Sequence, residues 1–128
     1  MILPYRQDVY MFPFSPNDIH YILDNYPKEG QMAKACEELS ELTQIISKKL
    51  SGSIDDKEFR TRLIDEMADV IIMLNQLLYM FDIDEKDDLN VRLGHKMERQ
   101  IDRILARKGE KEWLNKKLKN VSKNYLKK

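Results

Sequence analysis

Cysteine, proline and glycine are scarce in this sequence of 128 residues. Cys36 is the only cysteine, which excludes an internal disulfide and a cluster of thiolate metal ligands. Its apolar helical surroundings predict a buried core residue. All four prolines lie at or before Pro27, and because proline interrupts helices, its absence from the rest of the chain favours long helices. Hydrophobic residues at 42% and charged residues at 34% are typical of a folded globular protein.

Long apolar segments are also missing. No uninterrupted apolar run exceeds five residues, the length of residues 70–74, whereas a helix that spans a bilayer needs about 20. The N-terminal segment lacks the basic start of a signal peptide and is interrupted by Pro4, Arg6 and Asp8. We therefore expect a cytoplasmic protein that does not insert into a membrane.

The formal net charge is zero, but the two signs are unevenly placed. Residues 1–106 carry 13 basic and 20 acidic side chains, a net charge of −7, and residues 107–128 carry 9 and 2, a net charge of +7. The sequence contains no glycine-rich loop and no recognised DNA-binding motif, so nucleic-acid binding is not favoured. We expect the basic segment to pack against the acidic part of the chain or against a neighbouring subunit.

Apolar residues recur at steps of three and four, as in amphipathic helices, and no segment shows the alternation of a strand. These steps predict a single all-α domain over residues 1–128, an antiparallel helical bundle of four main helices. Residues 1–15 form an N-terminal arm, and residues 110–128 form a basic C-terminal helix or tail. The four main helices are expected over residues 16–26, from 29 or 31 to 50, 55–81 and 87–108.

Capping signals support these boundaries. Ser15 before Pro16 is a favourable helix start, Asp55 with Glu58 resembles a capping box, and glycine marks two helix ends, at Gly52 and at position 109. On the second helix, apolar residues at helical spacing predict a buried face made of Met32, Cys36, Leu39, Ile46 and Leu50.

Four carboxylates lie beside the apolar faces of the second and third helices. Glu38 and Glu41 form one pair, spaced i, i+3, and Glu66 and Asp69 form another. Two helices joined by a short loop run antiparallel, so residues equidistant from the loop lie level. The midpoint of 41 and 66 is 53.5, as is that of 38 and 69, which falls in the loop at 51–54. Because packed helices lie about 8–10 Å apart, inward-pointing carboxylates at these positions would converge.

Converging carboxylates repel one another, and a bound cation relieves that repulsion. Oxygen ligands alone favour a hard ion such as Mg²⁺, with Mn²⁺ as an alternative. A di-iron centre is disfavoured, because it requires Glu-x-x-His on two helices and neither His20 nor His95 follows a glutamate by three positions. The alternative without a metal is that each acidic pair belongs to a solvated helix face.

The two acidic motifs resemble those of a known family. Residues 37–41, EELSE, and residues 66–69, EMAD, are similar to the EE-x-x-E and E-x-x-D motifs of the MazG-like all-α nucleoside triphosphate pyrophosphohydrolases. Lys96 and Arg103 resemble the Lys and Arg of the family's third-helix signature, and Gln100 departs from it where an Asn is expected. The resemblance covers about residues 29–105. It implies Mg²⁺-dependent hydrolysis of a (d)NTP to (d)NMP and pyrophosphate, by attack of a metal-activated water at the α-phosphorus.

The resemblance also implies roles for individual residues. Glu38, Glu41, Glu66 and Asp69 would bind the metal, and Glu37 would be a further ligand, a group that orients the ligands, or a general base. The implied substrate-binding residues include Gln31 near the base or sugar and Lys96 and Arg103 at the phosphates; the full set is Gln31, Lys34, Lys96, Gln100 and Arg103.

The assembly and the exact reaction stay open at this point. A single carboxylate hairpin exposes a broad apolar surface, so we expect a homodimer or homotetramer that buries it. Phosphoribosyl-ATP pyrophosphohydrolases share the implied architecture and would differ in substrate. A helical interaction module whose acidic pairs serve only solubility is the alternative without catalysis. The expected role of the enzyme is to clear or balance nucleotides.

Overall fold

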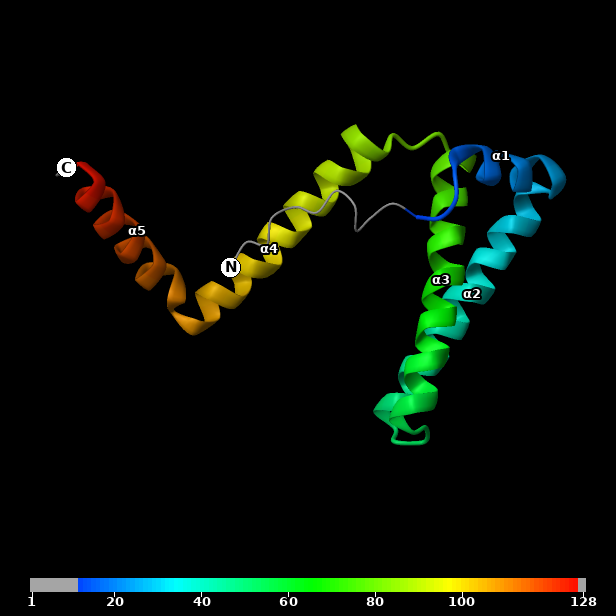
Figure 1. Ribbon diagram of the computed structural model, residues 1–128, viewed down its shortest axis with the longest axis horizontal. Helices are drawn as coiled ribbons and strands as arrows, with labels where there is room; N and C mark the ends of the chain where they lie inside the picture. The colour runs from blue at the N-terminus through cyan, green and yellow to red at the C-terminus, as the bar shows by residue number, and fades with distance from the viewer. Residues whose placement is uncertain (1–11, 127–128) are drawn as a thin grey trace. The chain divides into compact units, whose positions relative to one another are not determined.

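The computed structural model describes residues 12–126, so most of the predicted N-terminal arm lies outside the described residues. Within that range the regular secondary structure is all helical, with no strand, which confirms the all-α class (Figure 1). None of the described helices is long and apolar enough to cross a membrane. The elements are α1 (Pro16–Asn25), α2 (Lys28–Leu50), α3 (Asp56–Met80), a π-helical turn η2 (Glu85–Leu89), α4 (Asn90–Lys108) and α5 (Glu110–Leu126).

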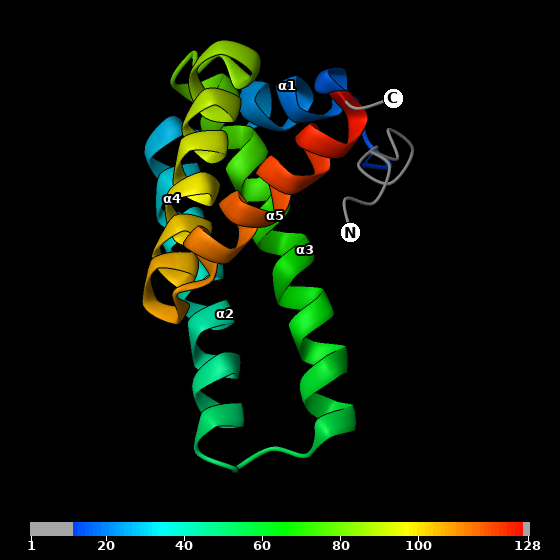
Figure 2. The same ribbon diagram turned by 90° about the vertical axis from the view of Figure 1, so that its left-hand side faces the viewer.

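The helices group into two compact units, which divide between Ile83 and Asp84. The first unit contains α1, α2 and α3, and the second contains η2, α4 and α5. In the first unit α2 and α3 run side by side as an antiparallel hairpin (Figure 2), and α1 packs against α3. That all of these helices form one domain over residues 1–128 stays a prediction.

The predicted helix ends are confirmed where local hydrogen bonds define them. Ser15 and Asp18 form a complete capping box at the start of α1, with the Ser15 backbone N–H donating to Asp18 Oδ2 at 2.8 Å. The Asp55 carboxylate accepts from the backbone N–H of Glu58 at 2.8 Å, at the start of α3. Gly52 has φ +72° directly after the C-cap of α2, a left-handed conformation that glycine adopts without steric cost.

The register of the hairpin is also confirmed. Gln31 Nε2 on α2 donates a hydrogen bond of 2.6 Å to Gln76 Oε1 on α3. The midpoint of 31 and 76 is 53.5, the value predicted from the two acidic pairs. Residues whose numbers share this midpoint therefore lie level along the whole hairpin, and Glu38 is level with Asp69.

The face of α2 that packs on α3 differs from the predicted one. Ala35, Glu38 and Ile45 are the buried residues of α2, and they pack against a face of α3 on which Val70 and Met73 are buried. The predicted buried face is wrong for the single chain, because its members are exposed: Met32, Cys36, Leu39, Ile46 and Leu50. α2 carries two sets of residues at helical spacing, offset from each other by one residue. The set that contains Glu38 is the one that packs against α3.

The second unit begins with a change of helical geometry. The predicted fourth helix starts at Asp87, but residues 85–89 form the π-helical turn η2, and α4 begins only at Asn90. The Asp87 backbone N–H donates to Asp84 Oδ1 at 2.8 Å, which ties this turn to the preceding residue of the loop. α4 ends at Gly109 in the left-handed conformation, with φ +67°, as predicted. The predicted C-terminal helix is present as α5.

Candidate metal centre

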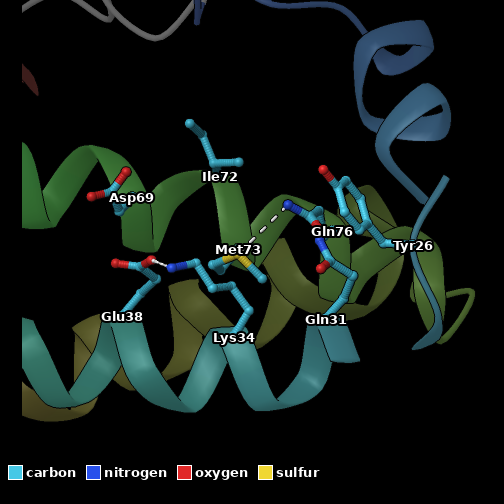
Figure 3. A pocket seen from close by; sticks show the side chains of 8 residues that line it. All are labelled: Tyr26, Gln31, Lys34, Glu38, Asp69, Ile72, Met73 and Gln76. Atoms are coloured by element: carbon cyan, nitrogen blue, oxygen red, sulfur yellow. Dashed lines mark hydrogen bonds and ion pairs between the residues drawn. The ribbon is translucent and has the colours of Figure 1, made fainter. Parts of the chain in front are cut away.

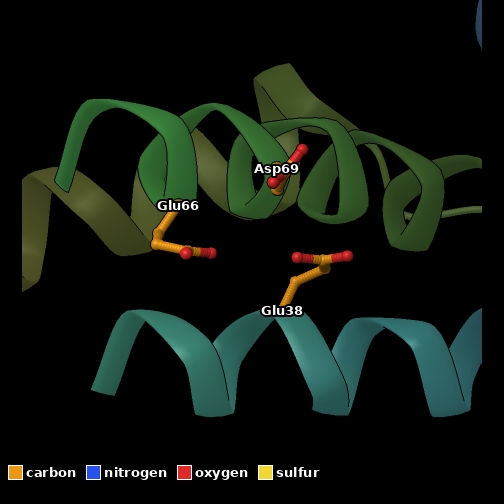
Figure 4. Close-up of side chains that lie close together, drawn as sticks. All are labelled: Glu38, Glu66 and Asp69. Atoms are coloured by element: carbon orange, nitrogen blue, oxygen red, sulfur yellow. The ribbon is translucent and has the colours of Figure 1, made fainter. Parts of the chain in front are cut away.

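Three carboxylates meet between the two helices of the hairpin. Glu38 projects from α2 toward α3, and Glu66 projects from α3 toward α2, with Asp69 one turn farther along α3 (Figure 4). Each side chain offers one oxygen atom, and these three atoms lie within 4.8 Å of one another. This separation suits three ligands of a single ion.

The register and the helical repeat together produce this arrangement. Glu38 and Asp69 are level on facing helices, and Glu66 precedes Asp69 by three residues, about one helical turn. Glu38 is buried, Glu66 is half-buried and Asp69 is exposed. The cluster is therefore closed at the Glu38 side and reachable from solvent at the Asp69 side.

Two carboxylate oxygens in the cluster are buried without a hydrogen-bond partner among the described residues. They are Oε2 of Glu38 and Oε2 of Glu66. A buried polar atom that lacks a partner costs about 1–3 kcal/mol, and more if it carries charge. A hard divalent cation would satisfy both oxygens, because Mg²⁺ and Mn²⁺ prefer carboxylate and water ligands. The donor set therefore fits the ion that the motifs imply.

Among the described residues, Lys34 places its ammonium group beside this cluster. Its Nζ lies 2.6 Å from Glu38 Oε1 and 3.6 Å from Glu37 Oε1. The hydrogen bond to Glu38, assisted by the charges of both glutamates, raises the pKa of Lys34 above its ordinary value. Lys34 thus neutralises Oε1 of Glu38, and Oε2 is the oxygen that has no partner among the described residues.

Glu41 and Glu37 lie at the margin of the cluster. Partial desolvation, followed by the negative charges of Glu66 and Glu38, raises the pKa of Glu41 above its usual range. Glu41 is level with Glu66 in the register of the hairpin, and it is not one of the three carboxylates that converge. Glu37 is exposed and faces Lys34. Direct metal binding by Glu41 or Glu37 stays a prediction.

A pocket of about 370 Å³ opens beside the carboxylates, between α2, α3 and the end of α1 (Figure 3). Two of its residues, Gln31 and Lys34, are predicted substrate-binding residues, and Glu38 and Asp69 form one end of it. Gln76 and Tyr26 line the other end, and neither was predicted from the sequence. Gln76 could have been found from its spacing, because it follows Asp69 by seven residues and so lies on the same helical face.

The remaining predicted substrate residues belong to the second unit. Lys96, Gln100 and Arg103 all lie on α4 and are exposed. Their contact with substrate phosphates stays a prediction.

Comparisons with protein-family models, with curated proteins and with solved structures find no match to this chain. The family resemblance therefore rests on the motifs quoted above, and the geometry of the site is an independent observation.

Proposed function

We propose that this protein is a Mg²⁺-dependent nucleoside triphosphate pyrophosphohydrolase, which converts a (d)NTP and water to (d)NMP and pyrophosphate. The observation that carries the proposal is the convergence of Glu38, Glu66 and Asp69, with two unpartnered buried oxygens, at one end of a pocket. The resemblance of the same residues to the MazG-like motifs supports the identity of the reaction.

The site has the features that phosphoryl chemistry requires. Glu38, Glu66 and Asp69 would hold Mg²⁺, which when bound neutralises phosphate oxygens and makes the phosphorus more electrophilic. The exposed Asp69 side leaves room for a triphosphate to approach. Lys34 lines the pocket beside Glu38, and in this proposal its ammonium group binds a phosphate oxygen and orients the substrate.

The reaction forms one bond and breaks one bond. The water oxygen bonds to the α-phosphorus, and the bond from the α-phosphorus to the bridging oxygen breaks, so that pyrophosphate leaves. The water must also lose a proton, and the carboxylates at the margin of the cluster, Glu37 and Glu41, are the candidate acceptors on this chain.

The test is a panel of ribo- and deoxyribonucleoside triphosphates with Mg²⁺, in which NMP and pyrophosphate are detected separately from NDP and phosphate. Asp69→Asn should lower kcat/KM by about 100-fold or more, because even residues that only support metal ligands are worth about 10–100-fold. Asp65→Asn is the matched control, since Asp65 is exposed on the same helix and lies outside the cluster. Absence of turnover by the folded protein on every nucleotide would refute the proposal.

We also propose that the protein works as a homodimer or homotetramer. Met32, Leu39 and Ile46 recur every seven residues on α2 and are 41–43% exposed. Ile64, Met67 and Leu74 form a similar stripe on α3 and are 46–56% exposed. On each helix, the exposed stripe lies one residue after the positions that pack against the other helix. Because the two helices are antiparallel, this equal offset places both stripes on the same side of the hairpin. A second copy would cover this apolar face.

A further inference from the structure

Gln76 is a polar side chain inside the packed interface of the hairpin. Only 2% of it is exposed, and it lies between the core positions of α3 and the pocket. An amide in such a place lowers stability unless its donors and acceptor are paired. Gln76 has two partners, Met73 on its own helix and Gln31 on α2.

These partners determine which way the two amides point. Gln76 Nε2 lies 3.6 Å from Met73 Sδ, and because a thioether sulfur only accepts hydrogen bonds, the NH₂ end of Gln76 is the end that faces it. Gln76 Oε1 is then turned toward Gln31 and accepts the bond of 2.6 Å from Gln31 Nε2. Gln31 therefore donates one of its own N–H groups to Gln76, and the Oε1 of Gln31 stays available as an acceptor.

The amide pair lies at a defined distance from the carboxylates. Gln31 precedes Glu38 by seven residues on α2, and Gln76 follows Asp69 by seven residues on α3. Seven residues are two helical turns, about 10 Å along the axis. That is about the span from the edge of a nucleobase across the sugar to the first phosphate. The pocket occupies the interval, with the carboxylates at one end and the amides and Tyr26 at the other (Figure 3).

The size of the pocket agrees with this division. Ligand pockets in proteins measure about 300–1,000 Å³, so a pocket of about 370 Å³ accommodates a nucleoside and leaves the triphosphate at its open, carboxylate end. The other end then receives the base, and the polar groups that line it are the amide pair and the Tyr26 hydroxyl.

We propose that Gln31 reads the nucleobase of the substrate, by accepting a hydrogen bond on its Oε1 from an N–H group of the base. Gln76 is a positioning residue, which holds the Gln31 amide in the orientation that presents this acceptor. The proposal rests on the proposed pyrophosphohydrolase function and on the place near the base or sugar that the family resemblance implies for Gln31. It adds the atom with which Gln31 recognises the base and the residue that orients that atom.

The test compares each accepted nucleotide with an analogue that lacks the N–H donor. The pairs are ATP with purine riboside triphosphate, CTP with pyrimidin-2-one riboside triphosphate, and UTP with N3-methyl-UTP, in the sugar form that the enzyme prefers. Loss of one neutral hydrogen bond should lower kcat/KM of the wild-type protein by about three- to ten-fold. In Gln31→Leu, nucleotide and analogue should be used equally, within about two-fold.

Gln76→Leu separates positioning from mere packing. It should reduce the discrimination between nucleotide and analogue and raise KM, while kcat and Mn²⁺ binding, measured by calorimetry, stay unchanged. A purely structural role of Gln76 would lower stability without changing the ratio of the two substrates. Gln44→Leu is the matched control, because Gln44 is exposed on α2 and lies outside the pocket. Gln76→Met, of similar volume to glutamine, serves if the leucine variant does not fold.

The outcomes distinguish this inference from the function on which it rests. Turnover with equal use of nucleotide and analogue by the wild-type protein would overturn base reading by Gln31 and leave the pyrophosphohydrolase intact. A lower kcat/KM for the analogue that persists in Gln31→Leu would also overturn base reading by Gln31 and leave the pyrophosphohydrolase intact. Absence of turnover on every nucleotide would refute the function, and base recognition with it.

Discussion

Replacing Glu38 by methionine should make the protein more stable than wild type in the presence of a metal chelator. In the presence of a divalent metal ion, the variant should be less stable than wild type. Glu38 is 5% exposed, and its Oε2 has no hydrogen-bond partner among the described residues. Its other oxygen pairs with Lys34, whose exposed side chain returns to water at little cost when the partner is removed. Glu38→Met therefore removes one unpaired buried oxygen, worth about 1–3 kcal/mol, and keeps a side chain of similar length and good helix propensity.

In chelator, the variant should consequently unfold at a higher urea concentration than the wild-type protein, by about 1–2 kcal/mol in the free energy of unfolding. With Mn²⁺ at 100 times its dissociation constant the wild-type protein should gain about 2.7 kcal/mol, and the variant should gain little. Wild type then becomes the more stable of the two. Urea denaturation followed by circular dichroism, in EDTA and in MnCl₂, measures all four values.

Glu98→Met is the control, because Glu98 is an exposed glutamate of α4; it should respond to Mn²⁺ as the wild-type protein does. Two results would refute the reasoning. A variant that is less stable than wild type in chelator would show that the buried carboxylate does not destabilise the hairpin. Equal stabilisation of Glu38→Met and wild type by Mn²⁺ would place the ion elsewhere.

Three further predictions concern assembly, the basic segment and the backbone. Ile46→Glu should shift the protein toward the monomer in sedimentation velocity because it places a charge in the exposed apolar stripe, whereas Ser47→Glu beside it should not; an unchanged distribution for both would exclude this interface. Deletion of residues 110–128 should weaken assembly or lower the melting temperature, and identical assembly, stability and turnover would refute packing of the basic segment. Gly52→Ala should lower the free energy of unfolding by about 1 kcal/mol, because Gly52 has φ +72°. Gly94→Ala should raise the free energy of unfolding by about 0.5–1 kcal/mol, because Gly94 lies within α4 with open space around it. Equal changes for the two variants in urea denaturation would contradict this.

Local signals were enough to predict the helices and much of the candidate site. Capping by Ser15 and Asp55 depends on hydrogen bonds within four residues, so the order of residues specifies it. Two helices joined by a short loop run antiparallel. Counting residues outward from the loop therefore predicts that Glu38 and Asp69 lie at the same level along the hairpin. The convergence of three of the four predicted carboxylates is a consequence of this register.

Other features depended on contacts that no local pattern contains. α2 has two stripes of helical spacing, and periodicity alone cannot choose between them; packing against α3 selected the stripe with Glu38 and left Leu39 and Cys36 exposed. The orientation of the Gln31 amide depends on Gln76, which is 45 residues away in the chain, and through it on Met73. The sequence by itself thus determined which helices form and how α2 and α3 align, since these depend on neighbouring residues and loop length. Only the tertiary structure decided which faces are buried and which polar atoms stay available, because both depend on what the partner helix brings.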